Sequence, residues 1–107
     1  MGTATYRFVY YDSRVKIEAI EFGTIPASKK KTTGSLEYKG EAKRVKLKSN
    51  GSLAVFIETS GPSFQGWDLY VEYDDGTKKR ELKTFPISRS IDANGYMIVN
   101  DDYLLKP

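Results

Sequence analysis

Alternation of apolar and polar residues with a period of two runs along almost the whole chain, and it constrains the fold more than any other feature. A period of two places successive side chains on opposite faces of a strand, whereas a helix needs a period of about 3.6. Gly, Asn, Asp and Pro interrupt the alternation at short intervals. We therefore predict strands at residues 4–11, 14–22, 34–39, 42–48, 53–59, 67–74, 77–85 and 95–99. Only residues 101–106, with acids first and a base last, have the charge order of a helical turn.

Composition limits the size and the setting of the fold. A chain of 107 residues supplies one hydrophobic core, so we expect a single domain over residues 1–107. It has no Cys, which excludes disulfides and thiolate metal sites and leaves stability to packing. No apolar run is long enough to cross a bilayer, and Met1-Gly2-Thr3-Ala4 lacks the regions of a signal peptide. We expect a soluble chain without membrane insertion.

Short, closely spaced strands are typical of sandwiches and barrels, and we predict an all-β fold, an antiparallel immunoglobulin-like β-sandwich of seven or eight strands. Its core should contain the apolar residues that alternate on one face of each strand. These are Phe8, Ile17, Phe22, Leu36, Val45, Leu47, Leu53, Val55, Ile57, Trp67, Leu69, Val71 and Leu82.

The sequence around Asp75-Gly76 predicts a hairpin with a two-residue turn. In this register Leu69 lies opposite Leu82, and two acids lie opposite bases: Glu72 opposite Lys79, and Asp68 opposite Lys83. The strands then have one apolar and one polar face. Trp67 is expected on the apolar, buried face and Tyr70 on the polar, exposed face.

A second hairpin is expected around Ser49-Asn50-Gly51, with Gly51 in the left-handed conformation. This three-residue loop would pair Leu47 with Leu53 and Val45 with Val55. The outer face of the hairpin would then be a basic strand face, to which a preceding loop of three lysines could add. The candidate binding residues are Arg44, Lys46, Lys48 and Phe56 on the hairpin, Lys29, Lys30 and Lys31 in the loop, and Tyr70 on the neighbouring polar face.

Residues 17–57 resemble the opening of a known family. Glu21-Phe22-Gly23-Thr24-Ile25-Pro26-Ala27, followed by a polar loop and a strand at Ser35-Leu36-Glu37-Tyr38, is similar to immunoglobulin-like sandwiches of the ASPM, SPD-2, hydin and major sperm protein kind. Lys39-Gly40-Glu41 departs from the Asn-Thr-Gly turn of that family. The resemblance implies an assembly or adhesion module and supplies no catalytic residue. From the residues alone, Phe22 should enter the core, Gly23 should permit the bend, and Pro26 should end the strand.

The chemistry of catalysis is poorly represented in this sequence. Without His or Cys, the usual nucleophile and base pairs, zinc sites and imidazole switches are excluded. Five oxygen-bearing residues near the C-terminus are of the type that calcium prefers, but their spacing is not that of an EF-hand: Asp92, Asn94, Asn100, Asp101 and Asp102. We favour a turn at Asp92-Ala93-Asn94-Gly95 instead. We predict no enzyme activity and no cofactor.

The function expected from these features is a non-catalytic protein-interaction or structural module that binds a protein or an acidic surface. It would use the basic strand face or an exposed edge strand. One alternative is a carbohydrate-binding module that stacks exposed aromatic rings such as Tyr70, Tyr10 or Tyr11 on sugars. Another is binding of single-stranded nucleic acid, in which Lys and Arg side chains would contact the phosphates and Phe56, Tyr38 or Tyr70 would stack on the nucleobases. The net charge of only +3 makes nucleic acid the weaker candidate.

Overall fold

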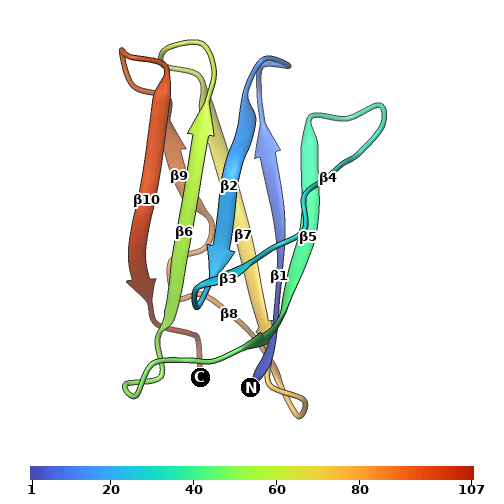
Figure 1. Cartoon of the computed structure of the whole chain (residues 1–107), viewed down its shortest axis with the longest axis vertical. Helices are drawn as coiled ribbons and strands as arrows, with labels where there is room; N and C mark the ends of the chain where they lie inside the picture. The colour runs from blue at the N-terminus through green and yellow to red at the C-terminus, as the bar shows by residue number, and fades with distance from the viewer.

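Ten β-strands build the molecule in the computed structural model, which describes all residues 1–107 (Figure 1). Three of the strands have only two or three residues, which is why the count exceeds the seven or eight expected. The strands are β1 (Gly2–Tyr10), β2 (Lys16–Phe22), β3 (Ile25–Pro26), β4 (Lys30–Lys31), β5 (Glu37–Val45), β6 (Leu53–Ser60), β7 (Gly66–Asp74), β8 (Lys79–Glu81), β9 (Ile87–Ser90) and β10 (Tyr96–Tyr103).

The strands form two antiparallel sheets, which confirms the predicted all-β class. Sheet A has the order β4-β5-β1-β7-β8, and β9 pairs with β7 beside β8. Sheet B has the order β10-β6-β2-β3. The chain crosses between the sheets after β1, β3, β5, β6 and β9, so neighbours in a sheet are mostly distant in sequence (Figure 1). Two sheets with a shared core are consistent with a sandwich. None of the elements is a helix that could cross a membrane.

One cluster of 22 buried apolar residues, from Ala4 to Leu105, forms the core. Trp67 is its largest buried side chain, packs against Phe8 with ring centroids 5.2 Å apart, and donates from Nε1 to Thr59 Oγ1 at 3.0 Å. Phe22 is fully buried, as expected. Two predicted core residues are wrong or only partly right. Leu36 lies just before the start of β5 and is 38% exposed, and Leu47 is only partly buried.

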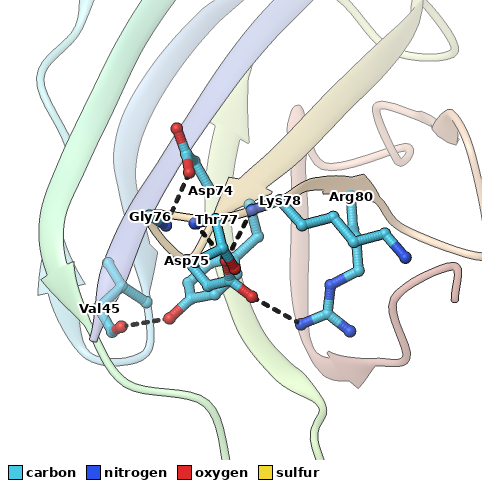
Figure 2. Close-up of polar contacts among 8 residues, drawn as sticks. Val45, Asp74, Asp75, Gly76, Thr77, Lys78 and Arg80 are labelled. Atoms are coloured by element: carbon cyan, nitrogen blue, oxygen red, sulfur yellow. Dashed lines mark hydrogen bonds and ion pairs between the residues drawn. The ribbon is translucent and has the colours of Figure 1, made fainter.

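The hairpin of β7 and β8 exists, but its predicted register is wrong by two residues. Glu72 lies opposite Glu81 rather than Lys79, and Asp74 lies opposite Lys79. The turn is longer than two residues because one oxygen of Asp75 accepts hydrogen bonds from the backbone N–H groups of Thr77 and Lys78 (Figure 2). A slip of two residues leaves every side chain on its predicted face. Trp67, Leu69, Val71, Tyr73 and Leu82 are therefore buried as expected.

The predicted hairpin of residues 42–48 with 53–59 does not form. Val45 pairs with Gly2 in sheet A, while β6 lies in sheet B between β2 and β10. Lys43 and Arg44 form a bulge in which Arg44 has a left-handed φ of 61°, and the ladder ends one residue later. Residues 46–52 then carry the chain across to sheet B. Gly51 does have the predicted left-handed conformation, with φ 82°.

Three other strand boundaries also differ from the prediction. Residues 34–39 and 42–48 are not two strands, because β5 runs unbroken through Gly40. Glycine is required there, since a Cβ would lie 1.8 Å from the carbonyl oxygen of Ser28. The predicted strand 77–85 ends at Glu81, and the separate strand β9 follows. Residues 101–106 do not form a helical turn, although their charge order is that of one: β10 continues to Tyr103 because β6 offers it a partner at every residue.

Candidate functional site

The predicted basic strand face is dispersed, because the hairpin that would have built it is absent. Arg44 lies at the bulge of β5, while Lys46 and Lys48 lie in the crossing segment 46–52. Lys48 Nζ donates to Asp102 Oδ2 at 2.7 Å and is therefore paired. Phe56 lies half-buried in β6 of sheet B, opposite Asn100. These four residues do not share one surface of one sheet.

The lysine loop lies at the edge of sheet A, beside β5. Lys30 and Lys31 form β4, and Lys30 lies directly opposite Lys39 of β5. Lys29 Nζ donates to the carbonyl oxygen of Glu18 at 3.3 Å. The lysine loop therefore extends the edge of sheet A and does not join a basic hairpin face.

Tyr70 is half-buried, at an outward position of sheet A opposite Arg7. Its ring meets Phe85 edge-on, with centroids 5.2 Å apart and planes at 74°. The Arg7 guanidinium lies 4.3 Å from the centre of the Tyr70 ring and also pairs with Glu37 at 3.3 Å. None of the six close ring pairs in the molecule is parallel. Tyr10, named with Tyr70 as a sugar-stacking candidate, is fully buried.

Asp68 binds two hydroxyl groups on the same outer face. The Tyr11 hydroxyl and the Ser88 hydroxyl both donate to its carboxylate. Ser88, rather than the predicted Lys83, lies opposite Asp68. The hydrogen bond to Asp68 raises the pKa of Tyr11, which keeps its phenol protonated. These hydrogen bonds connect Tyr11, β7 and β9 through the Asp68 side chain.

The acidic segment near the C-terminus forms the predicted turn. Asp92 Oδ1 accepts hydrogen bonds from the N–H groups of Asn94 and Tyr96, at 2.8 and 3.0 Å, and Gly95 has a φ of 88°. Asp101 and Asp102 lie farther along, in β10. No group of three or more His, Cys, Asp or Glu side chains is placed to hold a metal ion.

Strand β10 presents an unpaired backbone edge that the sequence interpretation did not single out. Its one hydrogen-bonded strand neighbour is β6. Gly61 N–H donates to the Gly95 carbonyl oxygen at 3.1 Å, and hydrogen-bonded pairs recur at every second residue of an antiparallel ladder. Val99 and Asp101 therefore bond to β6. The backbone groups of Ile98, Asn100 and Asp102 point away from it.

Both ends of this edge are closed by other backbone groups. At the start, the N–H of Asp92 donates to the Tyr96 carbonyl oxygen at 2.8 Å. At the end, the N–H of Lys83 donates to the Leu104 carbonyl oxygen at 2.8 Å. Between these closures lies an open segment, residues 97–103, which we call the open edge. A hollow of about 580 Å³ adjoins it and is lined by Lys83, Thr84, Arg89, Asp101, Asp102, Tyr103 and Leu104.

The exposed side chains of β10 are apolar at its start and polar farther along, at Asn100, Asp101 and Asp102. Ile98 is 54% exposed, and the preceding Tyr96 is 51% exposed. Natural edges are commonly blunted by charged residues, above all Lys, or by Pro. Residues 96–103 contain neither Lys nor Pro, and their only charges are those of Asp101 and Asp102. That composition was visible in the sequence, but its meaning depended on knowing that this strand lies at an edge.

Comparison with models of protein families, with curated proteins and with solved structures gave no match. The geometry of the chain therefore carries the functional inference.

Proposed function

We propose that this chain is a non-catalytic protein-interaction module that binds an extended segment of a partner protein as an additional strand along the open edge. The observation that carries the proposal is the row of outward backbone groups at Ile98, Asn100 and Asp102. An added strand would hydrogen-bond to these groups and pack side chains against Ile98 and Tyr96. Of the two surfaces predicted from the sequence, the geometry favours the edge strand over the basic face.

We also propose an immunoglobulin-like architecture, on the basis of the resemblance of residues 17–57. Phe22 and Pro26 occupy the expected positions at the end of β2 and in β3. The sheet membership of β1 and β2 gives less support, because these strands lie in different sheets, whereas the first two strands of an immunoglobulin constant domain are neighbours in one sheet. An assembly role is compatible with strand addition in either case.

The other candidate functions have weaker support. Glycan stacking favours coplanar exposed rings, and the outward-facing rings of Tyr70 and Phe85 are nearly perpendicular. Binding of single-stranded nucleic acid favours a continuous basic groove. The candidate Lys and Arg residues are instead distributed over β4, the β5 bulge and the crossing segment 46–52.

Selection from a displayed library of random twelve-residue peptides would test strand addition. The matched variants are Asn100→Pro and Asp101→Pro. Asn100→Pro removes an outward N–H and should leave the free energy of unfolding within about 1 kcal/mol of wild type. Asp101→Pro removes an N–H that bonds to β6 and should destabilise the fold.

We expect the wild-type chain to enrich peptides with alternating β-branched or aromatic residues, and the folded Asn100→Pro variant to lose them. Equal enrichment by Asn100→Pro would contradict the proposal. So would a wild-type selection without any enriched pattern.

A further inference from the structure

The outer face of sheet A contains a hollow of about 240 Å³, on the other sheet from the open edge. Strands β1, β7 and β8 form its floor, and the segment that follows β8 supplies Phe85 as a wall. Tyr70 and Phe85 make an aromatic corner, because their ring planes stand at 74°. Glu72 and Glu81 lie at its polar side.

Two glutamates on neighbouring strands line this hollow. Glu72 of β7 lies directly opposite Glu81 of β8, and like charges directly opposite each other destabilise a sheet. Glu72 has no basic group within ion-pair distance. Arg7 also lines the hollow, but its guanidinium pairs with Glu37 and lies over the Tyr70 ring. A positive charge placed between the two glutamates would relieve the repulsion.

The ammonium group of Lys106 already contacts one glutamate and one aromatic ring of this hollow. Lys106 Nζ lies 3.2 Å from Glu81 Oε1 and 5.3 Å from the centre of the Phe85 ring. The backbone N–H of Lys106 donates to the Glu81 carbonyl oxygen at 2.8 Å, which holds the C-terminal segment beside β8 (Figure 1). A carboxylate with an aromatic face is a combination that favours organic cations. Lys106 thus contacts Glu81 and Phe85, while Glu72 keeps its charge unpaired.

We propose that this hollow is a binding site for an alkylammonium group, such as the side chain of a lysine in a protein partner. The ligand's nitrogen would lie between Glu72 and Glu81, its alkyl stem would pack on Phe85 and Tyr70, and Lys106 would compete with it for Glu81. Two carboxylates completed by aromatic rings favour an organic cation over a metal ion, which prefers further oxygen ligands.

Titration with Nα-acetyl-lysine methylamide, followed by the backbone amide signals of Thr5, Glu72 and Glu81, tests this site. The neutral norleucine analogue is the matched probe. We expect saturable shifts with the lysine derivative and none with the norleucine derivative. Removing the internal competitor by Lys106→Ala should strengthen binding at least about twofold. Glu72→Gln should weaken it about twofold to fivefold, the range of a partly exposed ion pair.

Glu58→Gln is the control, because Glu58 lies in β6 of the other sheet and its loss should leave the titration unchanged. The proposal is overturned if neither wild type nor Lys106→Ala gives saturable shifts, if the norleucine derivative shifts the same signals, or if Glu58→Gln weakens binding as much as Glu72→Gln. Asn100→Pro should bind the lysine derivative normally, so the outcome here is independent of strand addition at the open edge.

Discussion

At the scale of single residues, the buried hydrogen bond between Trp67 and Thr59 connects the two sheets. Trp67 belongs to β7 of sheet A, and Thr59 belongs to β6 of sheet B. Thr59 is fully buried; its hydroxyl accepts from Trp67 Nε1 at 3.0 Å and donates to the Met97 carbonyl oxygen at 2.9 Å. The hydroxyl therefore satisfies polar groups of both sheets inside the core.

Replacing Thr59 by Val keeps the shape of the side chain and leaves the indole N–H without an acceptor. A buried donor without a partner costs about 1–3 kcal/mol, so we expect a loss of stability of that size. Urea unfolding followed by the fluorescence of Trp67, the sole tryptophan, measures it. Thr33→Val, at an exposed loop position, should change stability by less than about 0.5 kcal/mol. Equal stability of the two variants would contradict this role of Thr59.

The inward face of most strands could be predicted residue by residue. Phe8, Phe22, Trp67 and Leu69 are buried because alternation assigns a face without reference to the partner strand. The prediction that Leu36 is buried was wrong, because alternation does not say where a strand begins. The predicted cross-strand partners of Glu72 and Asp68 were also wrong, since these partners depend on the register of the strands.

At the scale of elements, the turn between β7 and β8 depends on the ionised carboxylate of Asp75. Asp75 Oδ1 accepts three hydrogen bonds from Thr77 and Lys78, including one from the Thr77 hydroxyl, and Asp74 Oδ1 accepts a fourth from Gly76 N–H (Figure 2). The Thr77 and Lys78 donors hold the pKa of Asp75 at about 2, below its ordinary 3.8. These donors favour the charged form of the Asp75 carboxyl, and with it the turn of residues 75–78.

The lowered pKa gives a pH dependence whose sign is fixed. A carboxyl whose pKa is lower in the folded than in the unfolded chain stabilises the fold above its unfolded value, and this contribution is lost as pH falls through the folded value. Asp75 should therefore stabilise the chain fully above about pH 4 and lose its effect toward pH 2. NMR titration of the Asp75 carboxyl carbon, with the urea-unfolded chain as the control, measures both values. A folded-state midpoint equal to the unfolded one would refute the assignment.

The hairpins show how far an element can be predicted. The Asp75 turn was located correctly because turn residues are a local signal, but its length was set by side-chain hydrogen bonds of Asp75. The Asn50 loop was also located correctly, and Gly51 has the expected conformation. Its flanking strands belong to different sheets, and strands with similar alternation offer several equally good partners.

At the scale of the whole molecule, the order of strands decides which surfaces are available. The predicted basic hairpin face does not form because β5 and β6 lie in different sheets, whereas β10 becomes an edge because its one neighbour is β6. Neither fact is contained in local sequence, since each depends on pairings between segments far apart along the chain. The candidate site at β10 was therefore predictable only as a class, an exposed edge strand, and not as residues 97–103.

Hydrogen exchange of the backbone amides of β10 tests the central claim, that this strand has one paired and one open side. The amides of Val99 and Asp101 should exchange at least about tenfold more slowly than those of Ile98, Asn100 and Asp102, because only the first two bond to β6. Slow exchange of all five consecutive amides would show that the edge is covered in solution and would contradict the account. Fast exchange of all five would contradict the pairing of β10 with β6.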